Sequence, residues 1–175
     1  MFPPLPAGTS EGVEPAEYDL MDAAEERTWW YRALHARVAH ALLRRPGPGG
    51  ALLDCGCGTG GTLAHLRARP GREMFGLEYN PQAAARARDK AGVAVASGDV
   101  NSLPFADGAF TAVLSLDVLC HRAVEPAQAL AEYRRVLRPG GTLILNMPSY
   151  GWMYSAHDSR GHNARRPTAG SLRAD

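Results

Sequence analysis

The feature that most constrains this chain is a glycine-rich segment that follows a short apolar run. The run covers residues 51–55, the glycine segment covers 56–61 (GCGTGG), and a helical pattern follows over 62–69. Four glycines in six residues let the backbone adopt positive φ and approach a ligand closely. A helix that begins there presents free N–H groups. A plain strand-to-helix turn needs only one or two glycines, so the segment predicts a nucleotide-binding loop.

The rest of the sequence predicts an α/β fold. Apolar runs typical of buried strands alternate with helical patterns, which favours a parallel sheet with right-handed crossovers. We expect strands at residues 51–55, 74–77, 93–96, 110–116 and 142–147. We expect helices at residues 16–45, 62–69, 81–91 and 126–137. The predicted fold is a Rossmann-like doubly wound, mostly parallel sheet.

Composition and patterning divide the chain and exclude several classes of protein. We expect a flexible N-terminal arm over residues 1–15, a single domain over 16–150, and an irregular tail over 151–175. A net charge of +1 argues against a nucleic-acid partner recognised through bulk charge. No apolar run reaches the ~20 residues of a membrane span, and the first residues lack the features of a secretory signal. Three cysteines form no disulfide framework, so we expect the reducing cytoplasm.

Acidic residues accompany the glycine segment at the predicted ends of neighbouring strands. Glu78 lies 22 residues after Gly56, where an acid accepts hydrogen bonds from ribose hydroxyls. Asp99 follows the third strand, where a carboxylate can accept a hydrogen bond from an adenine amino group. Asp54 precedes the loop and can order its backbone or hold a ligand ammonium through water. Because the loop also fits G-x-G-x-x-G, an NAD-dependent oxidoreductase remains an alternative to other nucleoside-binding enzymes.

These segments resemble the class I S-adenosylmethionine (SAM)-dependent methyltransferases, in particular the small-molecule type 11 group. They occur in that family's order and at its usual spacings, within about residues 25–165. The matching segments are residues 53–60 (LDCGCGTG), 76–80 (GLEYN), 98–105 (GDVNSLPF), 110–117 (FTAVLSLD) and 134–145 (RRVLRPGGTLIL). Residues 26–32 (ERTWWYR) look like the family's lead-in helix, which caps the SAM pocket, with Thr28 in place of its usual histidine.

The resemblance implies transfer of a methyl group from SAM to a small-molecule acceptor. The glycines would line the methionine and ribose of SAM, Glu78 would hold the ribose hydroxyls, and Asp99 would hold the adenine amino group. Val100 would pack near the adenine ring, and the end of the fourth strand would lie near the methyl donor. The implied cofactor-binding residues are Tyr31, Arg32, Asp54, Gly56, Gly58, Gly60, Glu78, Asp99, Val100, Leu116 and Asp117.

Methyl transfer from a sulfonium needs little acid–base machinery, so we expect no catalytic triad. A general base is required only for an acceptor that is protonated at the working pH. Candidates on the acceptor side are His121, Tyr154, His157, Asp158 and His162, of which His121, His157 and Asp158 are the candidate catalytic residues. The alternative for each histidine is a polar surface loop.

A zinc site is the alternative interpretation of the cysteine positions. Cys55, Cys57, Cys120 and His121 would supply a Cys₃His ligand set. Two of these cysteines interleave with the loop glycines, however, so their side chains should point into the core between sheet and helix. We therefore expect free buried cysteines and no bound metal.

The family fold has seven strands, and this sequence supplies five. Arg165-Arg166-Pro167 stands where the family has Arg-Arg-Tyr, and the proline disfavours a helical Arg166. We expect a truncated member in which the fifth strand is an exposed edge that invites homodimerisation. The cofactor residues all precede the loss, so an alternative is a catalytically impaired, SAM-binding remnant.

Overall fold

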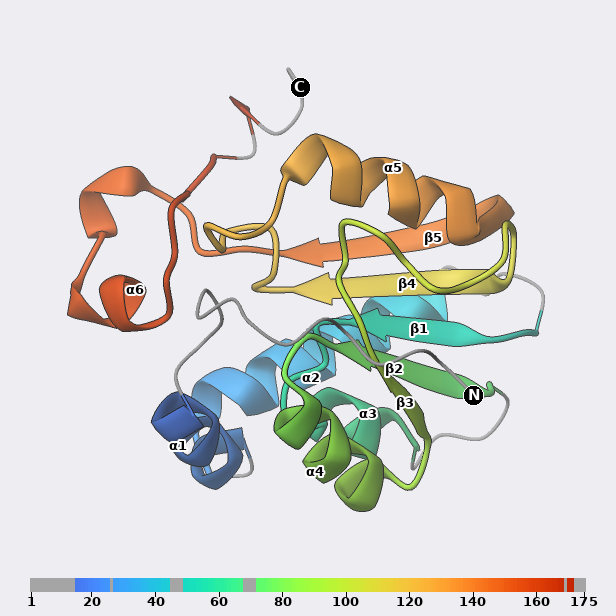
Figure 1. Cartoon of the computed structure of the whole chain (residues 1–175), viewed down its shortest axis with the longest axis horizontal. Coiled ribbons are helices and arrows are strands. Elements are labelled where there is room, and N and C mark those ends of the chain that lie inside the picture. Colours follow the sequence, from blue (N-terminus) through green and yellow to red (C-terminus); the bar gives the residue numbers. More distant parts are fainter. Residues whose placement is uncertain (1–14, 26, 45–48, 68–71, 169, 172–175) are drawn as a thin grey trace.

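The computed structural model describes residues 15–25, 27–44, 49–67, 72–168 and 170–171. Within them lies a five-stranded parallel sheet with the order β3-β2-β1-β4-β5 (Figure 1). The strands are β1 (Leu52–Cys55), β2 (Met74–Glu78), β3 (Ala94–Ser97), β4 (Phe110–Leu116) and β5 (Leu137–Asn146). The chain moves outward from β1 to β3 and then returns to place β4 on the other side of β1. This reversal lies between β1 and β4, and doubly wound folds bind ligands at the carboxyl ends of the strands on either side of such a reversal. The predicted fold class is confirmed.

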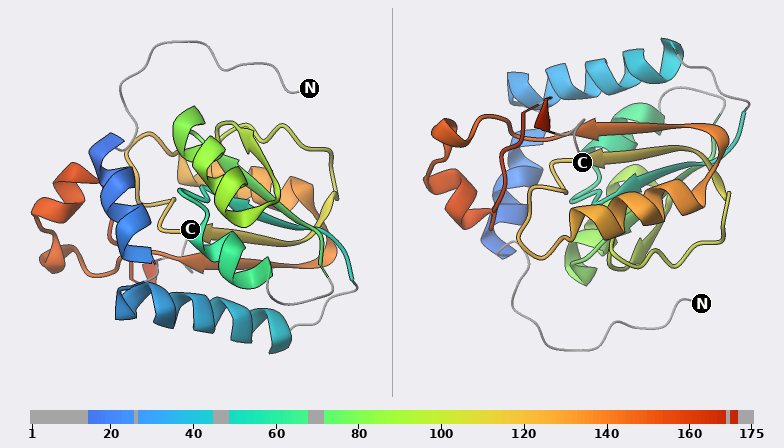
Figure 2. Two further views of the ribbon diagram at one scale, coloured as in Figure 1. Left: turned by 90° about the horizontal axis from the view of Figure 1, so that it is seen from below. Right: turned by 90° about the horizontal axis from the view of Figure 1, so that it is seen from above.

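Helices cover both faces of the sheet (Figures 1 and 2). The helices are α1 (Pro15–Glu25), α2 (Trp29–Arg44), α3 (Gly61–Arg67), α4 (Pro81–Ala91), α5 (Pro126–Val136) and α6 (Ala156–Arg160). Adjacent strand residues feed two separate cores, because side chains alternate along a strand. Leu52 joins the core shared with α2, α3 and α4, whereas Leu53 joins the core shared with α5. None of the helices in the described residues combines the length and the apolar character of a membrane span.

The helix predicted at residues 81–91 is confirmed as α4, and its first residues show why it begins there. The Asn80 side chain accepts hydrogen bonds from the backbone N–H groups of Gln82 and Ala83, at 2.8 and 3.1 Å, so Asn80 is the N-cap. Pro81 occupies the first helical position, where a missing N–H costs nothing. Gly92 ends the helix in the left-handed conformation. These caps fix the start of α4 directly after β2, the strand that ends at Glu78.

The prediction of one helix over residues 16–45 is wrong. The chain turns between α1 and α2, where the backbone N–H groups of Arg27 and Thr28 both donate to the Ala24 carbonyl. Apolar residues spaced four apart, Leu34 and Val38, are buried within α2. No glycine or proline marks the break, so the apolar spacing alone gave no reason to expect it. The turn allows α1 to lie at the end of the sheet toward which the strands point (Figure 2).

Two further differences concern the C-terminal part of the chain. The last strand was predicted at residues 142–147, but β5 already begins at Leu137 and includes Pro139, Gly140 and Gly141. The register jumps from Phe110–Leu137 to Ala112–Thr142, so the residues between form a bulge. The predicted arm lies outside the described residues except for Pro15, which begins α1. β5 forms an edge of the described sheet, and homodimerisation through it stays a prediction.

A buried histidine on α2 predicts a loss of stability in acid. The ring of His35 lies 5.1 Å from that of His65 on α3, and burial together with His65 lowers the pKa of His35. Because its folded pKa lies below the unfolded value of ~6.5, this contribution is complete above that value and is lost as the pH falls. Between pH 7.5 and 5.5 the free energy of unfolding should therefore depend less steeply on pH in His35→Gln than in the parent. Urea titrations measure this slope, and His40→Gln, at an exposed position of α2, should retain the parental slope.

Candidate functional site

The glycine loop and Glu78 meet at the carboxyl edge of the sheet. The Gly58 N–H donates to Glu78 Oε2 at 2.9 Å, and the Asn80 N–H donates to Glu78 Oε1 at 3.0 Å. A third donor, the Tyr18 hydroxyl of α1, lies 2.8 Å from Glu78 Oε1. The Glu78 side chain is buried, with only 5% of its surface exposed. The structure therefore brings together Gly58 and Glu78, which are twenty residues apart in the sequence.

The three predicted cofactor glycines of the loop all have positive φ, at +75° for Gly56, +55° for Gly58 and +89° for Gly60. A Cβ at Gly56 would lie 2.4 Å from Val118 Cγ2, and one at Gly60 would lie 2.7 Å from the Cα of Ala87. At Gly58 the nearest atom is the sulfur of Met21 on α1, at 2.9 Å. Gly56 and Gly60 thus serve tight packing within the fold, whereas Gly58 faces only a flexible side chain.

Asp54 is the clearest unsatisfied group in the described structure. It is 1% exposed, and its Oδ1 atom has no hydrogen-bond partner among the described residues. Burial, followed by the nearby carboxylates of Glu25 and Glu78, raises the pKa of Asp54 to about 7. The Thr59 hydroxyl, inside the glycine loop, is likewise buried without a partner there. Buried polar atoms are normally paired, so these two groups suit a ligand that brings a cation and a hydrogen-bond donor.

Asp99 lies at the same edge as Glu78, one strand further out. The Gly98 N–H donates to the Glu78 carbonyl at 3.1 Å and ties the end of β3 to the end of β2. Asp99 is half-buried, and its Oδ1 accepts from the Asn101 N–H at 2.8 Å. Val100 is buried in the core that contains Leu77. The predicted pair of acids therefore shares one rim with the glycine loop.

The end of β4 and the start of α2 carry the remaining predicted cofactor residues, Leu116, Asp117, Tyr31 and Arg32. Asp117, directly after Leu116, has a φ of +57°, and its Oδ1 accepts from the side chain of Asn146 at 2.8 Å. Burial and the carboxylates of Glu25 and Asp117 raise the pKa of Tyr31 to about 12, so this phenol stays protonated close to both acids. The other predicted residue of α2, Arg32, is exposed.

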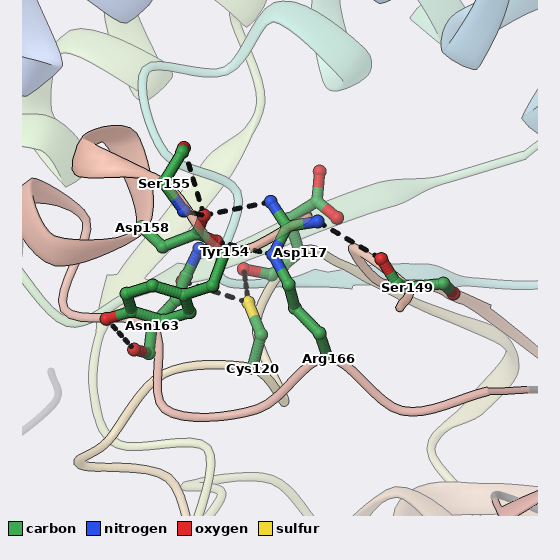
Figure 3. Close-up of polar contacts among 8 residues, drawn as sticks. All are labelled: Asp117, Cys120, Ser149, Tyr154, Ser155, Asp158, Asn163 and Arg166. Atoms are coloured by element: carbon green, nitrogen blue, oxygen red, sulfur yellow. Dashed lines mark hydrogen bonds and ion pairs between the residues drawn. The ribbon is translucent and has the colours of Figure 1, made fainter. Parts of the chain in front are cut away.

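On the acceptor side, Asp158 joins Ser155, Asn163 and Arg166 in a hydrogen-bonded cluster, the Asp158 clasp (Figure 3). Its oxygens accept from Arg166 Nε and Nη2, each at 2.9 Å, and from Asn163 Nδ2 at 3.0 Å. The backbone N–H of Ser155 adds a further bond at 2.8 Å. The Arg166 guanidinium holds the pKa of Asp158 well below its usual range. An ionised carboxylate with these partners holds the loop together, and the predicted catalytic role of Asp158 stays a prediction.

The clasp is joined to His121, which lies just beyond β4. His121 Nδ1 lies 2.8 Å from the Gly161 carbonyl oxygen, so Nδ1 carries the proton that this contact requires. Burial lowers the pKa of His121, which favours the neutral ring with a proton-accepting Nε2. His121 and Asn163 also form a backbone bridge. Among the other candidates, the Tyr154 hydroxyl donates to the Asn163 carbonyl at 3.0 Å.

For two further histidine candidates, His162 and His157, the described residues give no side-chain contact that bears on the predicted role. His162 has a φ of +53°, and its carbonyl accepts from the Arg122 N–H at 3.0 Å. His157 lies in α6, and its side chain is outside the described part of the structure. Their predicted roles stay predictions.

The cysteines are free and buried, as the sequence predicts. Burial raises the pKa of each thiol, to about 12 for Cys120. The Cys120 thiol donates to Asn163 Oδ1 and to the Asp117 carbonyl, both at 3.2 Å, and so belongs to the hydrogen-bonded clasp. Within the described residues, no three His, Cys, Asp or Glu side chains are grouped to hold a metal ion.

Sequence reasoning missed the face that α1 presents to the site. Tyr18, Met21, Asp22 and Glu25 follow the spacing i, i+3, i+4 and i+7, which places them on one side of a helix. The face mixes acidic, aromatic and apolar side chains, so it does not stand out as an apolar stripe. Its spacing was nevertheless visible in the sequence.

Comparison with known proteins assigns the chain to a family. Residues 53–145 match the methyltransferase domain family. A 37.1 kDa protein in transposon TN4556 of Streptomyces fradiae is 42% identical over 80% of this chain and 41% of its own length. The 24-methylenesterol C-methyltransferase 2 of Oryza sativa is 36% identical over 70% of this chain and 34% of its own length. The chain therefore spans less than half the length of these two relatives.

Solved structures agree with the sequence match. SAM-bound CalS10, an amino pentose methyltransferase from Micromonospora echinaspora, superimposes with a TM-score of 0.66 at 26% identity. The superposition covers 84% of this chain and 62% of that protein. The family match extends from β1 to β5 and includes the glycine loop, Glu78 and Asp99. The chain belongs to the methyltransferase domain family.

Proposed function

We propose that this chain binds SAM and transfers its methyl group to a small-molecule acceptor. The observation that carries the proposal is the cluster at the carboxyl edge, where Glu78 holds the Gly58 N–H near Asp54, whose buried Oδ1 atom has no hydrogen-bond partner among the described residues. This cluster would offer a carboxylate acceptor to ligand hydroxyls and, at Asp54, a buried oxygen that lacks a donor. The family membership of the chain supports the same activity.

Each acid of the pocket has a distinct part in the proposal. Glu78 would accept hydrogen bonds from the ribose hydroxyls, and Asp99 would accept one from the adenine amino group. Asp54 would attract the cationic methionine part of the cofactor. When bound, SAM supplies a methyl group on a positively charged sulfur, which needs no further activation. Asp117 and Tyr31, at the inner end of the pocket, would face the reacting centre.

The acceptor would bind beyond the end of β4. His121, held neutral with Nδ1 bonded to Gly161, would take a proton from an acceptor that carries one at the working pH. The Asp158 clasp would hold His121 in place, and His157 remains a candidate on the same segment. Exposed apolar side chains follow β5 and offer a surface for a small organic acceptor, namely Tyr150, Trp152, Met153 and Tyr154.

Ligand titration by calorimetry tests the proposal. We expect the purified chain to bind SAM and its demethylated product, S-adenosylhomocysteine, and not NADH. Asp99→Asn should weaken S-adenosylhomocysteine about tenfold, because the hydrogen bond from the adenine amino group to a charged acceptor is replaced by a weaker neutral one. Asp89→Asn is the matched control, since this aspartate is an exposed residue of α4. Binding of NADH without S-adenosylhomocysteine would instead establish the oxidoreductase alternative.

A further inference from the structure

Helix α1 lies against the pocket and places a tyrosine on the proposed ribose acceptor. The Tyr18 side chain is only 7% exposed, and its hydroxyl donates to Glu78 Oε1 at 2.8 Å. Burial and the negative charge of Glu78 raise the pKa of Tyr18, so the phenol keeps its proton and remains a donor. A buried hydroxyl that donates to a carboxylate makes the same interaction that a sugar hydroxyl makes there. Tyr18 thus satisfies Glu78 from within the chain.

The same face of α1 covers the glycine loop. The Met21 sulfur lies 2.9 Å from the position of a Cβ at Gly58, and the Glu25 carboxyl carbon lies 2.4 Å from that of a Cβ at Gly61. The helix therefore follows the loop from Gly58 to Gly61 while Tyr18 reaches Glu78. A ligand that used the Gly58 backbone and Glu78 together would meet atoms of α1 in both places.

Ion pairs to α4 hold α1 in this position. Arg86 pairs with Asp19, and Lys90 pairs with Asp22 and, at 2.7 Å, with Glu25. The Arg86–Asp19 pair is largely exposed, and such pairs contribute little to stability. Glu25 is 6% exposed, so its pair with Lys90 is better shielded. Several polar contacts therefore hold the helix, and each of them can break separately.

We propose that Tyr18 controls access to the nucleoside site, its hydroxyl occupying the place of a ribose hydroxyl at Glu78 so that α1 must move away before the cofactor binds. The inference rests on the proposed function for the identity of the ligand. It follows that the apparent affinity for the cofactor is reduced by the fraction of molecules in which α1 is closed. Contacts that hold α1 closed then weaken cofactor binding, although they touch no ligand.

Calorimetry with S-adenosylhomocysteine separates this gate from an ordinary ligand contact. Tyr18→Phe should bind about tenfold more tightly than the parent, because the closed state loses a buried hydrogen bond to a charged acceptor. Arg86→Ala, which breaks an exposed tether, should bind about twofold more tightly. Tyr133→Phe is the matched control: its buried hydroxyl bonds Ser115 in the core, and its affinity should equal the parent's. An unchanged or weaker affinity in Tyr18→Phe would overturn the proposal.

Lys90 provides a readout that needs no ligand, because it is the only lysine of the chain and its ammonium pairs with α1. Acylation of Lys90 by an amine-reactive ester, followed by mass spectrometry, should be several-fold faster in ligand-free Tyr18→Phe than in the parent. It should also accelerate when S-adenosylhomocysteine is added to the parent. If no variant binds S-adenosylhomocysteine, the proposed function is wrong. The acylation rate of the ligand-free protein still tests whether Tyr18 holds α1 closed. Equal rates in ligand-free parent and Tyr18→Phe, with both folded by circular dichroism, would refute it.

Discussion

Replacing Gly60 by alanine is expected to lower the free energy of unfolding by about 4 kcal/mol, as the sum of backbone strain and overpacking. The backbone at Gly60 has a φ of +89°, which costs any residue with a side chain. The added Cβ would lie 2.7 Å from the Cα of Ala87 and 3.0 Å from its carbonyl oxygen. These are backbone atoms of α4 and cannot rotate away. Urea denaturation of the folded chain measures the loss.

Gly140→Ala is the matched control for that result. Gly140 also has a positive φ, at +77°, but no atom lies within 4 Å of its Cβ position. This variant should lose only the strain of the left-handed backbone, about 1–2 kcal/mol. The difference between the two variants isolates the contact between the glycine loop and α4. Equal losses would show that α4 moves aside at little cost, contrary to the packing described here.

The central fold was predictable because its determinants are local. Each strand is a short apolar run, and Asn80-Pro81 carries its own helix start. The alternation of strands and helices then leaves few topologies, since parallel crossovers are right-handed. The same rule places the ends of β1, β2 and β3 along one edge, so the nearness of Gly58, Glu78 and Asp99 could be predicted without any contact being known.

The features that escaped prediction depend on contacts between distant segments. The break between α1 and α2 allows Tyr18 to reach Glu78, sixty residues away. No glycine or proline in the sequence indicates this break. The bulge in β5 depends on pairing with β4, which the Pro-Gly-Gly sequence alone does not reveal. Asp158 was predicted as a catalytic candidate because it follows the fifth strand in a stretch that borders the acceptor cleft in the family that the sequence resembles. The structure gives it a largely buried guanidinium partner, and only the fold shows that Arg166 turns back to meet it.

Arg166→Ala is the second substitution with a large expected effect, because it leaves the Asp158 carboxylate buried without its cation. Breaking a buried ion pair in this way costs about 3–5 kcal/mol. The clasp lies outside the sheet, so the cost should appear as local opening of residues 149–166 rather than as global unfolding. Hydrogen exchange of the Asn163 and Ala164 amides, which bond to the carbonyls of Asp158 and Cys120, should accelerate about 100-fold. Amides of β1 should keep their protection.

The pH dependence of this opening distinguishes a lost ion pair from lost packing. The folded pKa of Asp158 is depressed, so the stabilisation is present above the unfolded value of ~3.9 and disappears as the pH falls through the folded pKa. The difference between parent and Arg166→Ala should therefore be largest near neutral pH and shrink in acid. Adding Asp158→Asn to Arg166→Ala removes the buried charge and should restore part of the protection. Since Gly161, the partner of His121 Nδ1, lies in the same segment, the single variant should also free the His121 ring, and the double variant should hold it again. A difference between parent and Arg166→Ala that does not vary with pH would assign the clasp to packing alone.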